Sequence, residues 1–270
     1  MPPTEIHPAH QTDLQVHRLD LYSDNYAWLL YNQDRAWIID PGQAEPVQSL
    51  LETLNVTLNG MLITHCHWDH VSGVEALNKQ HNLPVYGTLG SHPSINTAIS
   101  EGDTLSLANH RFEVWQTPGH MADHLSFYYQ QKGWLFCGDT LFSAGCGRLK
   151  QTGNLSQLFN SVQRFKTLPG STKVFCSHEY TQKNLAFAAE VEPSNAAIKT
   201  YQQTAANLRA CHKPTIPSTI EQEIACNPFL RLEQAEIIAK VAAQTGHSEE
   251  TLKRDPFAVF AALRKWKDVF

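Results

Sequence analysis

Short apolar runs alternate with turn-type residues through the first two-thirds of the chain. Residues 28–31 and 36–39 are two such runs, and the polar Asn32-Gln33-Asp34 between them predicts a β-hairpin. Asp40-Pro41-Gly42 then ends the second strand. Further strands are expected at 60–64, 112–117, 134–137 and 174–177, and a helix at 74–79.

Helical periodicity dominates after about residue 180. Ser248, followed by Glu249 and Glu250, is a typical helix N-cap with an acidic first turn. A proline-containing stretch, 213–218, links two of the expected helices, which cover 184–191, 195–211, 234–244 and 256–269. The pattern predicts an α/β domain at residues 1–180 and a smaller, all-helical domain at 181–270.

Composition and charge exclude several classes of protein. A formal net charge of -5 argues against nonspecific binding to nucleic acid. No apolar run approaches the ~18 residues of a membrane span, and residues 1–13 lack the pattern of a signal peptide. The six cysteines form no CxxC pair, which is typical of reduced thiols. We expect a cytoplasmic protein with no membrane, nucleic-acid or obligate protein partner.

Histidine is abundant, and four potential metal ligands fall within six residues. Thr64-His65-Cys66-His67-Trp68-Asp69-His70 contains the pattern His-x-His-x-Asp-His. The i, i+2 spacing of His65 and His67 suits an extended segment, in which alternate side chains share a face. The segment follows an apolar strand and precedes a helix, so we expect a metal site at the carboxyl end of a strand.

Three more residues of ligand type have the same position relative to a strand. His120, Asp139 and His178 each follow a β-type run. A catalytic zinc ion takes three or four protein ligands, so seven ligands exceed the needs of one ion. They suit two ions that share a carboxylate, and Asp139 is the natural bridge because a carboxylate has two oxygens.

Two divalent ions in such a site hold a hydroxide between them. Asp69 and Asp139 are the carboxylates expected to take part in catalysis. Zinc is the favoured metal, with iron and manganese as alternatives, because His and Asp ligands admit all three.

Other residues near these positions have less specific interpretations. An isolated histidine is usually a satisfied core or surface residue, and His124 is expected at most to orient a ligand. Thiolates bind zinc, but Cys137 and Cys176 lie inside apolar strands, where cysteine behaves as a small buried hydrophobe.

Several stretches resemble the glyoxalase II (hydroxyacylglutathione hydrolase) family of the metallo-β-lactamase superfamily. The His-x-His-x-Asp-His motif marks only the superfamily. The more specific matches are Thr117-Pro118-Gly119-His120, Gly138-Asp139-Thr140-Leu141-Phe142, Gly145-Cys146-Gly147-Arg148, His178-Glu179-Tyr180-Thr181, Glu192-Pro193-Ser194-Asn195-Ala196-Ala197 and Asn227-Pro228-Phe229-Leu230-Arg231.

The resemblance implies a four-layered αββα sandwich followed by a helical domain. It implies that one ion is bound by His65, His67 and His120 and the other by Asp69, His70 and His178, with Asp139 bridging. The glutathione contacts that it implies are Arg148, Tyr180, Asn184, Arg264 and Lys267.

Arg264 and Lys267 are spaced i, i+3 and share a helix face, where each could meet a glutathione carboxylate. The alternative for both is an ordinary solvated helix face. The chain also departs from the family pattern. Lys150 stands at a usually aromatic position, Gln151-Thr152 replaces Glu-Gly, and Met121-Ala122-Asp123-His124 follows His120.

The predicted activity is hydrolysis of S-(2-hydroxyacyl)glutathione to glutathione and a 2-hydroxy acid. The family substrate is S-D-lactoylglutathione, which gives D-lactate in methylglyoxal detoxification. The metal-held hydroxide attacks the thioester carbonyl and the thiolate leaves, since a thiol has a pKa near ~8.5. The alternatives are a glutathione persulfide dioxygenase, a β-lactamase, a nuclease of the superfamily and a non-catalytic binding protein.

Overall fold

The computed structural model describes residues 13–270, so residues 1–12, where the sequence predicts no export signal, lie outside the described part. The chain forms two compact units. One runs to Ile99 and adds Leu105–Arg111, and the other comprises Ser100–Thr104 and Phe112–Phe270. Within residues 13–270, no helix combines the length and the apolar character needed to cross a bilayer.

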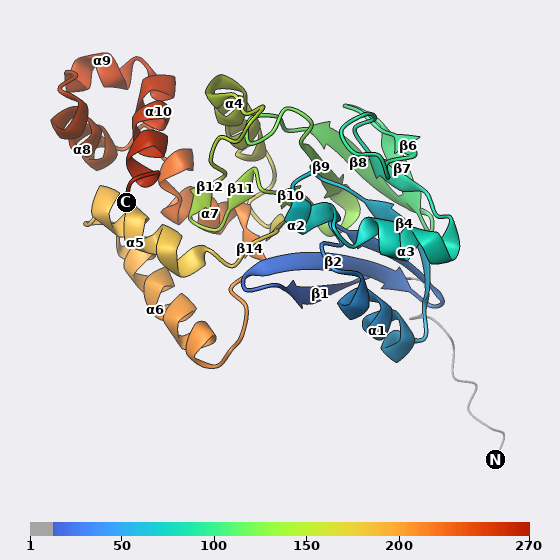
Figure 1. Ribbon diagram of the computed structural model, residues 1–270. Coiled ribbons are helices and arrows are strands. Elements are labelled where there is room, and N and C mark those ends of the chain that lie inside the picture. The colour runs from blue at the N-terminus through green and yellow to red at the C-terminus, as the bar shows by residue number, and fades with distance from the viewer. Residues whose placement is uncertain (1–12) are drawn as a thin grey trace. The chain divides into compact units, whose positions relative to one another are not determined.

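The first unit contains a six-stranded sheet with the order β1-β2-β3-β4-β5-β6 (Figure 1). β1 to β3 are antiparallel neighbours, whereas β3 to β6 run parallel. The hairpin predicted across residues 32–34 is confirmed, because Asn32 pairs with Arg35. The strands are β1 (Gln15–Leu21), β2 (Asn25–Asn32), β3 (Arg35–Ile39), β4 (Thr57–Leu62), β5 (Val85–Gly87) and β6 (Thr97–Ala98).

Helices of the first unit pack on this sheet through apolar side chains. Val47 of α1 and Leu77 of α3 lie in one buried core with Leu29, Ile38 and Met61 from the strands. The helices are α1 (Ala44–Leu54), the short α2 (Trp68–Val71) and α3 (Val74–His81). The helix predicted at 74–79 is therefore confirmed, and α1 was not predicted.

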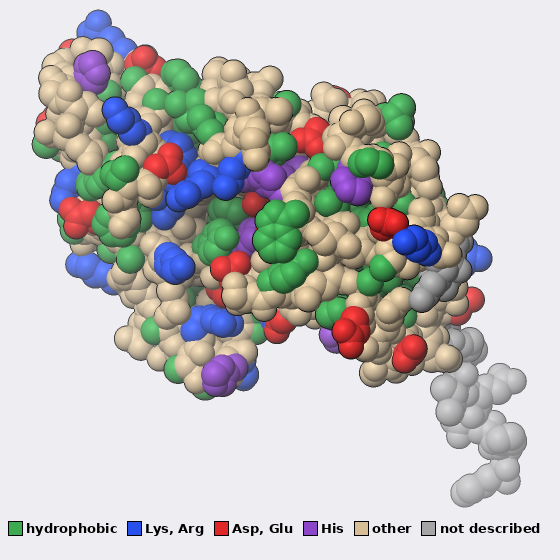
Figure 2. Space-filling view, viewed as in Figure 1, with side chains coloured by type: hydrophobic (Ala, Val, Ile, Leu, Met, Phe, Trp, Pro, Cys, Tyr) green, Lys and Arg blue, Asp and Glu red, His purple; other side chains and the backbone are tan. Residues whose placement is uncertain are grey.

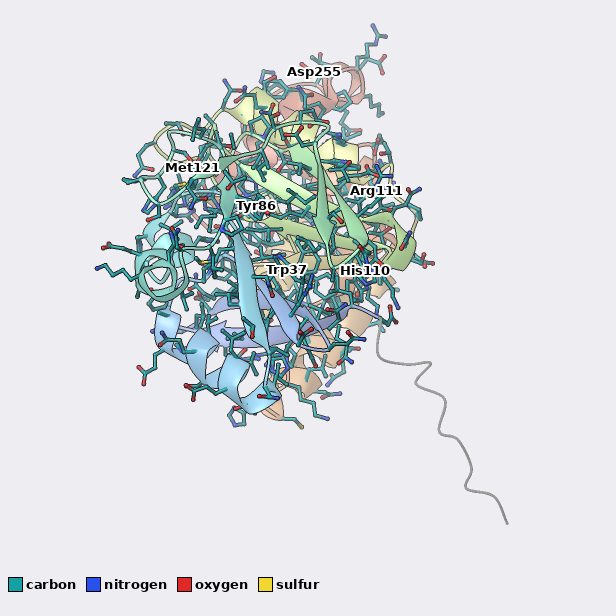
Figure 3. All side chains as sticks on the ribbon, turned by 90° about the vertical axis from the view of Figure 1, so that its right-hand side faces the viewer. Trp37, Tyr86, His110, Arg111, Met121 and Asp255 are labelled. Carbon is teal, nitrogen blue, oxygen red and sulfur yellow. The ribbon has the colours of Figure 1, made fainter. Side chains whose placement is uncertain are left out.

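Gly60 lets two aromatic side chains from the neighbouring strands of the first sheet pack close to the backbone of β4. Trp37 on β3 and Tyr86 on β5 are labelled in Figure 3, and Gly60 lies on β4 between those strands. A Cβ atom on Gly60 would lie 3.1 Å from Trp37 Cδ1 and 3.3 Å from Tyr86 Cε2. The apolar run 60–64 thus includes a glycine because aromatic rings fill the space above it.

The second unit contains a sheet with the order β14-β13-β10-β9-β8-β7. β8 and β10 are both antiparallel to β9, and β13 is parallel to β10. The carboxyl ends of β8, β10 and β13 therefore lie at one edge of the sheet. The strands are β7 (Thr104–Leu107), β8 (His110–Gln116), β9 (Leu125–Tyr129), β10 (Trp134–Gly138), β13 (Lys173–Cys176) and β14 (Ser218–Thr219), with β11 (Leu141–Phe142) and β12 (Gly145–Cys146) as a separate hairpin.

Most helices of the second unit follow β13. The predicted cap is confirmed, because the Ser248 side chain accepts a hydrogen bond from the Thr251 amide, and Asp255, labelled in Figure 3, caps the last helix in the same way. The helices are α4 (Leu155–Phe165), α5 (Thr181–Val191), α6 (Ala196–Ala210), α7 (Ile220–Cys226), α8 (Ala235–Thr245), α9 (Glu249–Lys253) and α10 (Pro256–Lys267), with 3-10 turns η1 (Gln130–Lys132) and η2 (Pro228–Leu230).

The predicted fold class, α/β with a helical C-terminal region, is confirmed. The two compact units do not coincide with residues 1–180 and 181–270, so this division into domains stays a prediction. The stretch 213–218 does not run directly from helix to helix: it ends in β14, which adds an edge strand to the second sheet before α7 begins.

Candidate active site

In the first unit, ligand-type residues follow the ends of two adjacent parallel strands. Asp40 follows β3, and the histidine motif follows β4. The buried Asp40 carboxylate accepts hydrogen bonds from the Thr64 amide at 2.8 Å and from His70 Nδ1 at 3.0 Å. Because the carboxylate accepts a hydrogen bond from Nδ1–H, the proton stays on Nδ1 and His70 Nε2 keeps its lone pair for a metal ion.

The two histidines of the extended segment face each other. His65 Nε2 and His67 Nδ1 are 2.9 Å apart, as expected for side chains at i and i+2. His65 Nδ1 contacts the Thr64 hydroxyl at 3.1 Å. The pair thus presents two ring nitrogens to one point in space.

Asp69 lies at the start of α2, and its carboxylate is oriented from β2. Asn25 Nδ2 donates to Asp69 Oδ2 at 2.7 Å, and His70 Nε2 lies 3.8 Å from the same oxygen. The backbone here passes so close to Gly42 that a Cβ atom would lie 2.0 Å from the Asp69 carbonyl oxygen. Gly42 is therefore required for this arrangement, as well as ending a strand.

In the second unit, Asp139 lies between two histidines. Its Oδ2 is 3.5 Å from His120 Nε2, and its Oδ1 is 3.4 Å from His178 Nε2. Two ligands of one tetrahedral ion, each at ~2.0–2.1 Å, lie about 3.3–3.4 Å apart. The three side chains are nearly buried, and each carboxylate oxygen faces a different histidine, so the donor set fits two metal ions sharing Asp139.

His124 orients Asp139 from behind. The Asp139 amide donates to His124 Nε2 at 3.1 Å, and His124 Nδ1 contacts the hydroxyls of Thr117 and Thr140 at 3.0 and 3.1 Å. An amide can only donate, so His124 Nε2 is the unprotonated nitrogen of this fully buried ring. This agrees with the expectation that His124 orients a ligand.

His120 is oriented by the backbone of the segment that follows β12. Its Nδ1 lies 2.6 Å from the carbonyl oxygen of Arg148. A carbonyl accepts only, so Nδ1 carries the proton and Nε2 directs its lone pair toward Asp139.

Cationic side chains gather around the end of α10. Arg148 Nε lies 3.7 Å from Asp268 Oδ1, and Arg264 Nη2 lies 3.1 Å from the same oxygen. Arg148 is exposed, Lys267 is half-buried and Arg264 is buried. Figure 2 shows Lys and Arg side chains grouped on the visible face near these C-terminal helices. Three cations with one carboxylate leave a net positive charge that suits an anion.

Burial, and then the nearby Arg264 guanidinium, lowers the pKa of Lys267 to about 8. Its Nζ lies 4.9 Å above the Phe187 ring. A carboxylate bound here would favour the charged lysine.

The remaining residues predicted to contact glutathione differ in exposure. Tyr180 is half-buried and stacks on the His178 ring at 4.7 Å with an angle of 6°. Asn184 is buried, and its Nδ2 donates to the Ser143 carbonyl at 2.8 Å. Arg264 Nη1 donates to the Cys146 carbonyl at 2.9 Å. The side chains of Asn184 and Arg264 therefore donate hydrogen bonds to backbone carbonyls in this structure.

The segments that depart from the family pattern lie in adjoining loops. Met121, labelled in Figure 3, contacts the Thr152 hydroxyl through its sulfur at 3.6 Å, and the same hydroxyl accepts from the Ala122 amide. Lys150 is exposed. The replaced residues thus contact each other across the two loops.

Comparisons with known proteins bear on this donor set. The metallo-β-lactamase superfamily model matches residues 23–178, and the model for the hydroxyacylglutathione hydrolase C-terminus matches residues 179–270. The chain is 43% identical over 260 residues to the hydroxyacylglutathione hydrolase of Idiomarina loihiensis, covering 94% of this chain and 99% of the relative. The chain belongs to the hydroxyacylglutathione hydrolase family. A second relative with the same name, from Pseudoalteromonas translucida, is 41% identical and is covered completely.

Solved structures carry the same fold as this member of the family. ETHE1 from Myxococcus xanthus has a TM-score of 0.64 at 25% identity, covering 94% of this chain and 99% of its own. The BLEG-1 B3 metallo-β-lactamase has a TM-score of 0.61 at 25% identity, covering 80% of this chain and 100% of its own. The superfamily fold, together with its His and Asp side chains, supports a dinuclear divalent-metal site.

Two residues that orient the ligands are not among the ligands predicted from the sequence. Asp40 was interpreted only as the end of a strand, although it has the same strand-end position as the other ligand-type residues. His124 was given a minor role at most. Asp40 directly follows β3, and this position was the available signal. His124 instead directly precedes β9, which is antiparallel to β8 and so begins where β8 ends.

Proposed function

We propose that the protein is a dinuclear-metal thioester hydrolase acting on S-(2-hydroxyacyl)glutathione. The observation that carries the proposal is Asp139, whose two carboxylate oxygens each lie 3.4–3.5 Å from a different histidine. A carboxylate placed this way can bridge two ions. The names of its relatives, which are hydroxyacylglutathione hydrolases, supply the substrate class.

The proposed ligand sets are His65, His67 and His120 for one ion and Asp69, His70 and His178 for the other, with Asp139 bridging the two ions. When bound, the two ions would lower the pKa of a water molecule and polarise the thioester carbonyl. Asp40 and the Arg148 carbonyl fix the tautomers of His70 and His120, so that both rings present Nε2 without reorganisation. Zinc is the favoured ion, with iron or manganese as alternatives.

The cationic group near α10 is proposed to bind the carboxylates of glutathione. Arg148 and Lys267 are accessible enough for direct contact, and the buried Arg264 adds charge behind them. Tyr180 and Asn184 complete the set predicted from sequence. The glutathione thiolate needs no dedicated acid, since a thiol pKa near ~8.5 makes it an adequate leaving group.

S-D-lactoylglutathione is the substrate that we favour, with glutathione and D-lactate as products in methylglyoxal detoxification. A cytoplasmic location fits the reduced thiols that the sequence predicts.

The assay that tests this function compares three substrates with the purified metal-loaded enzyme. We expect loss of the S-D-lactoylglutathione thioester with release of one thiol per thioester, little β-lactam hydrolysis, and no oxygen uptake with glutathione persulfide. Oxygen uptake without thioester hydrolysis would favour the dioxygenase alternative and reject the proposal.

A further inference from the structure

The hairpin of β11 and β12 lies in the chain between Asp139 and Arg148, and buried side chains surround its backbone. Ser143 and Ala144 form its turn, and Ala144 has a positive φ of 55°. Each strand of the hairpin is only two residues long, so the backbone hydrogen bonds between its two strands are too few to fix its position. Its remaining polar backbone groups need other partners.

Side chains from the helices of the second unit supply these partners. Asn227 Nδ2 donates to the carbonyls of Phe142 and Gly145 at 3.3 and 2.9 Å. Glu223 Oε2 accepts from the Ala144 amide at 2.8 Å. Asn184 holds the Ser143 carbonyl, and Arg264 holds that of Cys146.

All four of these side chains are buried, and two of them contact each other. Asn184 and Arg264 are 4% exposed, and Glu223 and Asn227 are 0% exposed. Asn227 Nδ2 also donates to Glu223 Oε2 at 2.9 Å. Burial raises the pKa of Glu223, consistent with a group that serves as a hydrogen-bonding partner. Buried hydrogen bonds of this kind favour one arrangement of the hairpin, because each lost partner leaves a costly unpaired group.

The far end of the hairpin contacts two of the proposed metal ligands. A Cβ atom on Gly147 would lie 2.1 Å from the Asp139 carbonyl oxygen and 3.2 Å from His120 Cβ. The next carbonyl, that of Arg148, accepts a hydrogen bond from Nδ1–H of His120. A displacement of the hairpin would therefore turn the His120 ring.

We propose that Asn184, Glu223, Asn227 and Arg264 are positioning residues for the metal centre, acting through the hairpin and the Arg148 carbonyl on His120 and Asp139. The helical region thus has a second role besides the proposed binding of glutathione. The expected loss of kcat rests on the proposed function. The hydrogen bonds to the hairpin and the measurement of metal affinity do not depend on it.

The test uses three variants of the side chains that bind the hairpin. Asn227→Asp removes the donor to the Phe142 and Gly145 carbonyls, and Glu223→Ala removes the acceptor for the Ala144 amide. Glu223→Gln keeps an acceptor oxygen. Glu192→Ala is the matched control. Glu192 is also a buried carboxylate of the helical region, and it accepts hydrogen bonds from Arg231 at 2.7 and 2.8 Å and from Asn195 at 2.9 Å. Gly145→Ala disturbs the hairpin directly, since its Cβ atom would lie 2.7 Å from the Asn184 amide.

Three quantities are measured on the full chain: unfolding by denaturant, Zn²⁺ affinity in competition with a chelator, and kcat and KM. We expect Asn227→Asp, Glu223→Ala and Gly145→Ala to bind Zn²⁺ about 10–100-fold more weakly and to lose kcat, which is typical of changes behind a metal ligand. Glu223→Gln should recover most of the affinity. Glu192→Ala should lose stability while keeping affinity and kcat.

Hydrogen exchange at the His120 ring of the metal-free protein gives a fourth measurement. A loss of stability alone does not change it while the protein stays folded. In ¹⁵N NMR spectra, the Nδ1–H of His120 should be protected from exchange in Glu192→Ala and exposed in the folded hairpin variants.

Folded hairpin variants that keep the Zn²⁺ affinity and the His120 signal of Glu192→Ala would overturn the inference. If Glu223→Ala does not fold, the comparison of Gly145→Ala and Asn227→Asp with Glu192→Ala still decides. A wild-type enzyme that hydrolyses no glutathione thioester would reject the proposed function and leave the affinity comparison valid.

Discussion

At the scale of single residues, the site depends on hydrogen bonds that already hold one atom of each ligand residue and leave another free to face a metal ion. Asp40 and the Arg148 carbonyl accept hydrogen bonds from Nδ1–H of His70 and His120, and His124 Nε2 accepts one from the Asp139 amide. Each of these contacts removes an alternative tautomer or rotamer before any metal binds. The donor set is thereby preorganised, which lowers the cost of forming the centre.

Replacement of Asp139 tests the bridging role. Asp139→Asn keeps the shape but leaves one oxygen, so it cannot bridge two ions as a carboxylate does. We expect kcat to fall by about 100-fold or more and the metal content to decrease, since charge stabilisation by metal is worth several kcal/mol. Elemental analysis and steady-state kinetics measure both, and an Asp139→Asn enzyme with full metal and full activity would eliminate the bridge.

Lys267 predicts how substrate binding changes with pH. Its pKa of about 8 means that the lysine is charged below pH 8 and neutral above it. A glutathione carboxylate binds the charged form, so KM should rise as the pH increases through about 8, while kcat changes little.

Lys267→Arg keeps its charge at all these pH values, so it should not show this rise in KM. Lys267→Met should have a raised KM already at neutral pH. A wild-type KM that follows the same pH profile as the Lys267→Arg enzyme would remove Lys267 from the substrate site.

At the scale of elements, the carboxyl ends of strands organise the site. β8, β10 and β13 end at one edge of the second sheet, and His120, Asp139 and His178 follow them there. In the first sheet, β3 and β4 do the same for Asp40 and the histidine motif. Strands of fixed direction thus bring together residues far apart in sequence.

The buried strands predict which thiols react. Burial raises the pKa of Cys176 to about 12 and that of Cys137 well above its usual value. In the folded protein, a disulfide reagent should label the exposed Cys211 first and the half-buried Cys66 more slowly. Mass spectrometry of partially labelled protein identifies the sites. Early labelling of Cys137 or Cys176 would contradict their packing.

The sequence predicted six of the fourteen strands in the described part of the chain, and most of its helices, because their apolar periodicity is local. The hairpin at 28–39, the helix at 74–79 and the Ser248 cap were all confirmed. The ligand motif was also visible, since its spacing is fixed by extended backbone. The partners of Asn184 and Arg264 could not be predicted, because they are backbone carbonyls 41 and 118 residues away. Such contacts depend on tertiary packing and leave no local pattern.

At the scale of the whole molecule, stability should depend on metal binding. Seven ligand-type side chains, most of them buried, contribute little to a conventional apolar core. An ion that binds only the folded state stabilises it by RT ln(1 + [L]/Kd), which is about 2.7 kcal/mol at 100 times Kd.

Chelation should therefore lower the Tm, and added Zn²⁺ should restore it. Calorimetry of the Asp139→Asn protein, in which one ligand set is impaired, should give a smaller difference between metal-free and metal-loaded samples. An equal Tm for the chelated and loaded wild type would mean that the fold does not depend on the centre.

The proposed enzyme brings two ions per chain and a glutathione thioester together in one site. The most direct test of this proposal is titration of the metal-free protein with Zn²⁺ while hydrolysis of S-D-lactoylglutathione is followed. We predict that activity rises until about two equivalents are bound and then stays constant, as a dinuclear site requires. Full activity at one equivalent, or no hydrolysis with two ions bound, would contradict it.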